Sequence, residues 1–224
     1  MLGRRFVVAF ERVLARALNK AFYRHSGGEN RPVFYNAAET LPQLLAIDEN
    51  YDAIREELMG VLPGVDEMRR YHEVDPDQLG ISDGDERAWR VFFPLRNAER
   101  CPRTSEVIRG IPNVLQAFFS ILEPHKSVPA HCGPGMHYLR YHTAFVVPEV
   151  NPPSIRVKDR HYTWREGESL LFDDSWEHEV SNDSDGIRVV LITDVMRPMP
   201  QPLHGLNRFW RSVRRKAQRG TKNF

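Results

Sequence analysis

The sequence predicts a mainly β domain, an antiparallel sandwich or jelly roll, with helices in its N-terminal part. From residue 116 onward apolar residues recur with a period of two, as in strands whose alternate side chains face a core. These strand-like runs are short and are separated by turn sequences, which is typical of sandwiches and jelly rolls. Before residue 61, apolar residues recur instead at helical spacing.

Two helical regions are predicted in the N-terminal part. Residues 4–24 form an amphipathic pattern with a basic face, and the glycines of 25–28 end it. Such a helix suits the surface of an anionic membrane, and it equally suits packing on the protein's own body. Residues 41–60 form the second helical region, followed at 65–87 by an acidic, turn-rich stretch that we expect to be a surface loop.

The strands follow in order along the rest of the chain. Residues 89–95 are predicted as a strand, and Thr104 is expected to cap a short helix that Gly110 ends. In the strand 138–147, Arg140 and His142 point the same way, because side chains two positions apart in a strand lie on the same face. The other predicted strands are 116–122, 154–158 and 161–164 as a hairpin, 168–172 and 187–195.

Charge is distributed unevenly, although the net formal charge is only +1. Residues 1–24 and 208–224 together carry +12, which leaves −11 for the residues between them. Basic ends on an acidic body favour contact with an anionic surface, and two solvated tails are the alternative. No nucleic-acid-binding motif accompanies the charge, which argues against nucleic acid as the partner.

The two cysteines, Cys101 and Cys132, are too few for a disulfide framework, so we expect a reducing compartment. No run reaches the about 18 apolar residues that span a bilayer, and residues 1–10 lack the features of a secretory signal. We therefore expect a cytoplasmic protein, peripheral on the inner face of a membrane if its basic ends bind lipid. The expected organisation is a basic amphipathic helix (1–26), a helical and loop part of the catalytic domain (27–115), a β core (116–198) and a basic C-terminal tail (199–224).

Two histidines and one arginine form the pattern that points to chemistry. His131 opens the run 131–134, His178 lies in the run 172–180, and Arg188 follows in a strand-like segment. Neutral imidazoles bind Fe(II), and the remaining coordination positions accept a bidentate 2-oxo acid and O2. The guanidinium fork of an arginine suits the far carboxylate of such an acid. This pattern therefore suggests a mononuclear iron site.

Between about Trp89 and Pro198 the sequence resembles the aspartyl/asparaginyl β-hydroxylase family. The matching motifs are, in order, Cys101-Pro102-Arg103-Thr104, Phe119-Ser120 with Pro124, His131-Cys132-Gly133-Pro134, Leu139-Arg140-Tyr141-His142, Trp164-Arg165-Glu166-Gly167, the run 172–180, Arg188, Asp194 and Arg197-Pro198. The resemblance implies a double-stranded β-helix (a cupin-like jelly roll) and an Fe(II)- and 2-oxoglutarate-dependent dioxygenase. It implies His131 and His178 as iron ligands. The co-substrate contacts that it implies are Ser120, Arg140, His142 and Arg188, with Trp89 as a further match.

The position two residues after the first histidine departs from the common iron triad. That triad has a carboxylate there, whereas this chain has Gly133. Members of the resembled family with glycine at this place use two histidines, and water fills the vacant position. Asp174 then orients a ligand or its water, or is itself a direct ligand. If water alone fills the vacant position, Gly133→Ala is expected to leave measurable activity. Asp173 is expected only to cap its turn.

Three functions remain open on the sequence. The first is hydroxylation of a peptidyl Asp or Asn, which Gly133 favours. The second is hydroxylation of an acyl chain in a membrane lipid of the lipid A or ornithine-lipid type, which the basic ends favour. The motifs at 41–43 and 54–57 also resemble bacterial enzymes of that kind. The third is a non-catalytic, cupin-like binding module.

Overall fold

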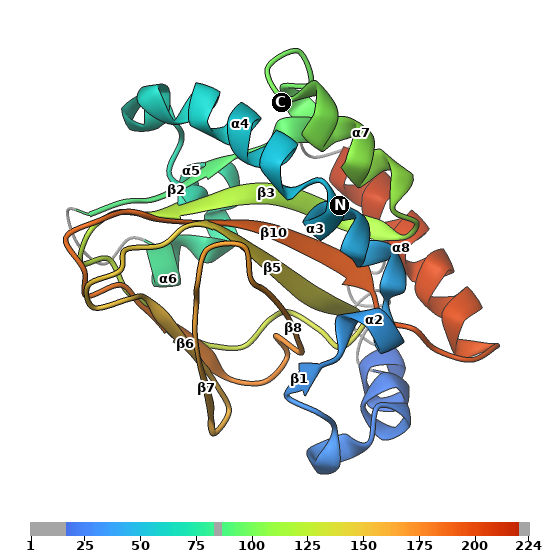
Figure 1. Ribbon diagram of the computed structural model, residues 1–224. Helices are drawn as coiled ribbons and strands as arrows, with labels where there is room; N and C mark the ends of the chain where they lie inside the picture. The colour runs from blue at the N-terminus through green and yellow to red at the C-terminus, as the bar shows by residue number, and fades with distance from the viewer. Residues whose placement is uncertain (1–16, 83–86, 220–224) are drawn as a thin grey trace, which may run out of the picture.

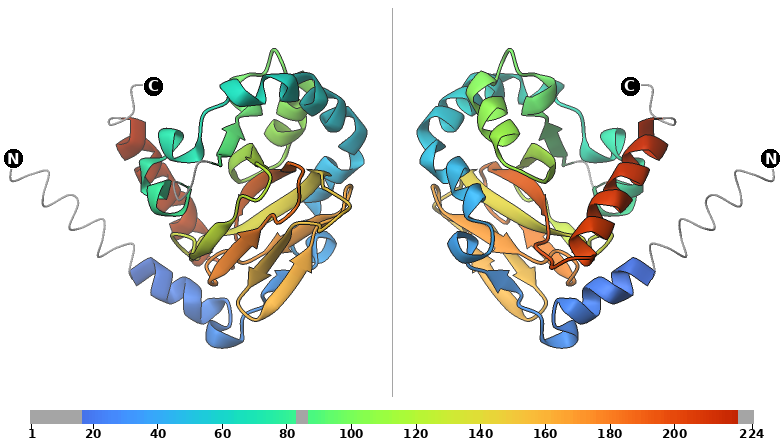
Figure 2. Two further views of the ribbon diagram at one scale, coloured as in Figure 1. Left: turned by 90° about the vertical axis from the view of Figure 1, so that its left-hand side faces the viewer. Right: turned by 90° about the vertical axis from the view of Figure 1, so that its right-hand side faces the viewer.

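The computed structural model of the protein describes residues 17–82 and 87–219. In this part of the chain two antiparallel β-sheets face each other, and helices cover the far side of the larger sheet (Figures 1 and 2). The larger sheet has six strands in the order β1-β8-β5-β10-β3-β2, and the smaller has four in the order β4-β9-β6-β7. The predicted fold, a double-stranded β-helix with N-terminal helices, is confirmed.

The elements have the following bounds. The strands are β1 (Phe34–Tyr35), β2 (Trp89–Phe92), β3 (Val114–Leu122), β4 (Val128–His131), β5 (Tyr138–Val146), β6 (Ser154–Val157), β7 (Arg160–Thr163), β8 (Ser169–Phe172), β9 (His178–Ser181) and β10 (Arg188–Met196). Residues 17–25 are helical, and the later α-helices are α2 (Ala37–Thr40), α3 (Leu45–Glu49), α4 (Tyr51–Val61), α5 (Tyr71–Val74), α6 (Leu79–Ser82), α7 (Pro102–Gly110) and α8 (Leu203–Arg219). Short 3-10 helices lie at Gly28–Asn30, Pro42–Leu44, Leu62–Glu67, Pro76–Gln78 and Pro94–Arg96.

Alternate side chains of the central strand β3 enter two different cores. Phe119 and Ile121 pack with residues of α3, α4 and α7 on the helix side of the sheet. Phe118 and Leu122 pack in the second core, between the two sheets. Ser120 lies between these two inward residues and is fully buried. The period of two in the sequence therefore places the Ser120 hydroxyl inside the jelly roll.

Strands β10 and β5 follow the same alternation. Val190 and Ile192 lie in the inner core, so Arg188 also points between the sheets, and its register partner on β3 is Leu122. Tyr141 of β5 belongs to the helix-side core. Its neighbours Arg140 and His142 therefore share the inner face, as their spacing predicted.

The stretch 65–87 differs from the predicted surface loop. As far as Ser82 it is wound into short helical turns, namely the end of the 3-10 helix Leu62–Glu67, α5, the 3-10 helix Pro76–Gln78 and α6. Tyr71 anchors this segment, because its ring is buried 4.5 Å from that of Trp89 and 5.4 Å from that of Phe118. The prediction was wrong because acidic, turn-rich composition does not reveal one aromatic side chain that covers the end of the inner core.

Helix α7 begins earlier than predicted, and Thr104 is not its cap. Pro102 occupies the first turn, where a missing backbone N–H is tolerated. Glu57 of α4 caps the helix instead, accepting hydrogen bonds from the backbone N–H of Arg103 (2.6 Å) and from the N–H (2.9 Å) and hydroxyl (2.6 Å) of Thr104. The sequence showed no such cap because the acceptor lies on another helix.

We expect Glu57→Ala to lower the free energy of unfolding by about 1–2 kcal/mol, since it removes the acceptor of three hydrogen bonds at a helix N-terminus. Glu56→Ala is the matched control, because Glu56 is exposed on the same helix. Urea unfolding of both variants measures the difference. Equal midpoints for the two variants would show that the contact with Glu57 adds no stability.

The predicted helix over 4–24 is seen only from residue 17, because its first part lies outside the described residues. The described part packs on the protein's own body, where Leu18 and Phe22 form a small core with Met136. Within the residues that the structure describes, no helix has the length and apolar character to cross a membrane. The C-terminal basic segment is helical over 203–219.

Candidate active site

Strands β4 and β9 bring His131 and His178 directly opposite each other. The two residues are register partners in the antiparallel pair, with ring centroids 4.2 Å apart and planes inclined by 53°. Each Nδ1 is hydrogen-bonded to the backbone carbonyl two residues earlier, that of Pro129 for His131 (2.8 Å) and that of Trp176 for His178 (2.9 Å). A carbonyl only accepts, so each Nδ1 carries the proton and each Nε2 keeps a free lone pair.

Both imidazoles are held neutral, which is the form that binds a metal. Burial lowers the pKa of His131, and burial followed by the nearby His131 lowers the pKa of His178 to about 3. In the described part of the chain, no group of three His, Cys, Asp or Glu side chains gathers as a metal site. The arrangement is therefore a pair of nitrogen donors rather than a complete protein triad.

The carboxylate of Asp174 lies in the space that a side chain at position 133 would enter. A Cβ added to Gly133 would lie 2.5 Å from the carboxylate carbon and both oxygens of Asp174. The backbone N–H of Gly133 also donates to the carbonyl of Asp174 at 2.8 Å. Glycine is therefore required at position 133 because the Asp174 carboxylate takes the place of its side chain.

Asp174 is fully buried and is held on one side only. Its Oδ2 accepts a hydrogen bond from the hydroxyl of Tyr138 at 2.6 Å and lies 3.2 Å from the Arg140 guanidinium. Its Oδ1 is buried with no hydrogen-bond partner among the described residues. Burial raises the pKa of Asp174 to about 6, against the opposing effect of Arg140. One oxygen is thus left to accept a proton-bearing group such as water.

Arg188 is a buried cation that has no acidic partner among the residues that the structure describes. It is 2% exposed, and its Nε has no hydrogen-bond partner in the described chain. Within the described residues its polar contact is a long one, 3.5 Å from Nη1 to the Ser120 hydroxyl, and its guanidinium lies 4.9 Å from the Trp164 ring centroid. Burial alone lowers its pKa to about 9. Because a buried charge is retained only with a partner, this side chain indicates an anionic ligand.

Ser120 and Trp89 extend the place where that anion would lie. The indole N–H of Trp89 donates to the Ser120 oxygen at 2.9 Å. With its oxygen accepting from the indole, the Ser120 hydroxyl keeps its own proton for a further acceptor. The structure therefore brings Trp89, Ser120 and Arg188 together, as the sequence predicted.

His142 lies between Arg188 and the histidine pair. It is 4% exposed, and neither ring nitrogen has a hydrogen-bond partner among the described residues. Its ring stacks on Trp164 at 5.8 Å and meets the edge of Phe172 at 5.0 Å, and Phe172 in turn lies 5.9 Å from His178. Burial keeps the pKa of His142 well below its usual value. A continuous line of rings thus joins the candidate metal end to the buried arginine.

Arg140 is placed on the inner face as predicted, but its guanidinium is already engaged by protein carboxylates. Nε and Nη2 form a bidentate contact with Asp194 at 2.8 and 3.0 Å, and Nη1 lies 3.2 Å from Asp174. Gln116 donates to the same Asp194 carboxylate at 2.6 Å. In this arrangement Arg140 holds Asp174 in place, so contact with a co-substrate remains a prediction for it.

Asp173 has a larger role than the predicted turn cap. Its Oδ1 does accept from the N–H and hydroxyl of Ser175. Its Oδ2, however, contacts Arg31 at 3.0 Å and Arg197 at 2.6 Å, all with nearly buried side chains. Arg197 also donates through Nε to the carbonyl of Met136 at 2.9 Å. This network ties the loop after His131 to the loop before His178.

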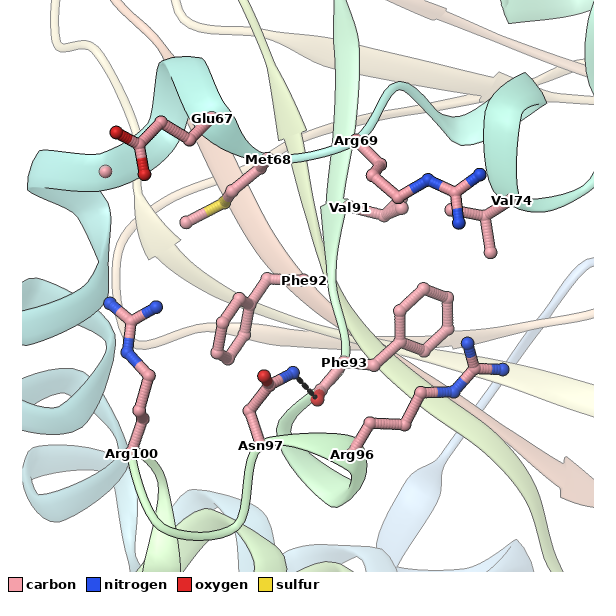
Figure 3. A pocket seen from close by; sticks show the side chains of 11 residues that line it. Glu67, Met68, Arg69, Val74, Val91, Phe92, Phe93, Arg96, Asn97 and Arg100 are labelled. Carbon is pink, nitrogen blue, oxygen red and sulfur yellow. Dashed lines mark hydrogen bonds between the residues drawn. The ribbon is translucent and has the colours of Figure 1, made fainter. Parts of the chain in front are cut away.

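A separate recess of about 450 Å³ lies along strand β2. Figure 3 shows Arg69, Arg96 and Arg100 around the rings of Phe92 and Phe93. The guanidinium of Arg96 lies 4.6 Å from the Phe93 ring centroid, and that of Arg100 lies 5.5 Å from the Phe92 centroid. None of the predicted site residues lines this recess, so it is distinct from the candidate active site.

Comparisons with known proteins identify relatives of this chain. A family model described as aspartyl/asparaginyl beta-hydroxylase matches residues 48–198. The chain is 38% identical over 186 residues to the ornithine lipid ester-linked acyl 2-hydroxylase of Rhizobium tropici, covering 80% of this chain and 65% of that protein. It is 38% identical over 104 residues to the human aspartyl/asparaginyl beta-hydroxylase, covering 46% of this chain and 13% of that protein.

Among solved structures, a prolyl-4-hydroxylase from Pseudomonas putida matches 66% of this chain and 88% of its own, with 13% identity and a TM-score of 0.46. The chain thus spans just under two thirds of its bacterial relative and a small part of the human one. The family model covers most of the chain, including every residue of the candidate site. The protein therefore belongs to the aspartyl/asparaginyl β-hydroxylase family, a family of hydroxylase enzymes.

Proposed function

We propose that the protein is an Fe(II)- and 2-oxoglutarate-dependent dioxygenase that hydroxylates an unactivated C–H bond. The observation that carries this proposal is Arg188, a buried cation with no acidic partner in the described chain, placed beyond a pair of neutral histidines. A metal held by the histidines and a dicarboxylate held by the arginine would together satisfy both features. Neither feature alone calls for such a ligand.

The residues present fit both groups. His131 and His178 would hold iron through their free Nε2 atoms. Arg188, Ser120 and the supporting Trp89 would bind the distal carboxylate of 2-oxoglutarate. The unpartnered ring nitrogens of His142 suit the opposite end of the same molecule. Iron and 2-oxoglutarate, when bound with O2, supply the oxidising chemistry.

The protein's own residues would bind the co-substrate, orient it and keep bulk water out of the site. Arg188 neutralises its buried charge on the co-substrate and so fixes the orientation of the acid. The free oxygen of Asp174 would accept a hydrogen bond from water beside the histidine pair, and Tyr138 and Arg140 keep that carboxylate in place. The aromatic wall of Phe172 and Trp164 excludes bulk water from the reacting region.

For the acceptor, a membrane-lipid acyl chain is the better supported class. The relative from Rhizobium tropici, named as an ornithine lipid acyl hydroxylase, matches 80% of this chain, compared with 46% for the human relative. A peptidyl Asp or Asn is the second candidate, favoured by Gly133 in place of the triad carboxylate. A cytoplasmic location, peripheral on a membrane, suits the lipid acceptor.

The test is turnover of 2-oxoglutarate to succinate by the iron-loaded protein, with mass spectrometry of lipid extracts and of the proteome for a gain of one oxygen. The proposal expects iron-dependent succinate formation, and the class of the oxidised molecule identifies the acceptor. A protein that binds iron and 2-oxoglutarate without turning over would be the binding module instead.

The geometry of Gly133 reverses the expectation that alanine is tolerated there. We expect Gly133→Ala to reduce turnover at least about tenfold, because the added Cβ displaces the buried Asp174 carboxylate from its hydrogen bonds. Gly110→Ala is the control, since a Cβ there meets nothing within 4 Å. Undiminished turnover in Gly133→Ala would mean that the position of Asp174 does not matter to the reaction.

A further inference from the structure

Helix α8 is attached to the protein mainly through polar groups. Along one side of the helix, Asn207 is fully buried and donates to the carbonyl of His137 at 2.8 Å. One turn later, Arg211 donates to the carbonyl of Val114. One turn earlier, Leu203 packs beside Phe22 and Met136. The three residues are four apart, so they form one stripe along the helix, facing the protein.

The large apolar side chains with known exposure on the other side of α8 face solvent. Leu206 is 42% exposed and Phe209 is 60% exposed. They are three residues apart, which places them on one face, well away from the stripe of Asn207 and Arg211. Helices packed on a domain normally bury their apolar face and expose their polar face. In α8, by contrast, Asn207 and Arg211 face the protein, while two large apolar side chains, Leu206 and Phe209, face solvent.

The charge on α8 indicates which partner would cover that face. Over 203–219 the helix has six basic residues and no acid. Arg208 stands next to Phe209 and is exposed. Exposed apolar groups flanked by many cations are typical of helices that lie in the headgroup region of an anionic bilayer. A second copy of the same helix would bring like charges together, which opposes that alternative.

We propose that α8 docks on an anionic lipid bilayer through Leu206 and Phe209, with Arg208 contacting the headgroups. This inference deepens the proposed function, because it names the surface on which the active site would meet a lipid acceptor. The partner is the lipid surface itself, and the docking residues are distinct from those of the candidate active site.

The position of α8 connects this surface to the active site. The side chain of Asn207 donates a hydrogen bond to the carbonyl of His137. Arg197 donates to the same carbonyl through its backbone N–H and to the carbonyl of Met136 through Nε. This loop follows His131 directly. In both views of Figure 2, α8 and the helical residues 17–25 lie on the same side of the molecule, and their apolar residues meet at Met136. A bilayer on the outer side of α8 would therefore be separated only by this helix from the loop that follows the first candidate iron ligand.

The experiment is co-sedimentation of the full-length protein with phosphatidylcholine vesicles, with and without phosphatidylglycerol. The proposal predicts binding to the anionic vesicles and little binding to the neutral ones. The double variant Leu206→Ser, Phe209→Ser should bind at least about tenfold more weakly, since two apolar side chains no longer enter the lipid. The matched control is Leu79→Ser, Val150→Ser, which removes two other exposed apolar side chains.

A second pair of variants tests the charge. Arg208→Glu should weaken binding to anionic vesicles about fivefold or more, whereas Arg109→Glu, an exposed arginine on α7, should not. Equal binding by the Leu206–Phe209 double variant and its control would overturn the proposal. So would self-association that disappears with the double variant, because the face would then be a contact between copies.

These measurements need neither iron nor 2-oxoglutarate. Failure of the wild-type protein to bind anionic vesicles, with intact succinate formation, would therefore reject the docking surface alone. Vesicle binding without any turnover would reject the proposed reaction alone. The double variant should keep the wild-type rate of 2-oxoglutarate turnover in the absence of lipid, since it leaves the site untouched.

Discussion

His178→Ala is expected to abolish iron-dependent turnover of 2-oxoglutarate, and His131→Ala is expected to do the same. Each substitution removes one of two nitrogen donors, which lie on register partners of the paired strands β4 and β9 with ring centroids 4.2 Å apart. The rate should fall more than about 100-fold, because even a residue that only supports a metal ligand contributes about 10–100-fold. Succinate formation and metal content of the purified variants give the measurement.

His161→Ala is the control for this pair, because His161 is exposed on β7. It should keep both iron and turnover. Asp174→Ala separates the two roles left open for that residue. If Asp174 only orients a ligand or its water, turnover should fall with iron retained, whereas a direct ligand predicts loss of iron as complete as in His178→Ala. Wild-type turnover in either histidine variant would contradict the ligand assignment.

Arg188→Lys is expected to raise the KM for 2-oxoglutarate at least about tenfold while iron binding stays intact. Lysine keeps the positive charge but loses the planar fork that contacts both carboxylate oxygens. It also loses the stacking of the guanidinium 4.9 Å from the Trp164 ring. Steady-state rates at varied 2-oxoglutarate concentration measure the effect.

Arg160→Lys serves as the matched control, since Arg160 is an exposed arginine on β7. An unchanged KM in Arg188→Lys would transfer the anchoring role to Arg140. The structure makes that outcome unexpected, because Arg140 already has two carboxylate partners, Asp174 and Asp194.

The sequence predicted the parts of the fold that depend on local periodicity. The inward face of β5, with Arg140 and His142 side by side, followed directly from a period of two. The hairpin of β6 and β7 followed from its turn residues. The predicted cap of α7 was wrong because it depended on a distant partner. Thr104 donates a hydrogen bond to Glu57 of another helix instead of capping its own helix.

In the candidate site, too, local motifs were predicted from the sequence, whereas contacts between distant residues were not. Motif resemblance brought His131, His178 and Arg188 together, and the structure places all three inside or at the edge of the jelly roll. The ion pairs of Asp173 were missed, because its partners Arg31 and Arg197 lie far away in the sequence and neither has a local pattern. The contact between Gly133 and Asp174 was missed for the same reason. A steric exclusion between two loops becomes visible only when both have been folded.

The central claim is that the buried charge of Arg188 is completed by a carboxylate of 2-oxoglutarate beside an iron held by the histidine pair. Anaerobic calorimetric titration of the Fe(II)-loaded, full-length protein with 2-oxoglutarate tests it most directly. We expect saturable one-to-one binding in the wild type and no detectable binding in Arg188→Ala, which should still retain its iron. Binding of 2-oxoglutarate by Arg188→Ala as tight as that of the wild type, or no binding by the wild type, would contradict it.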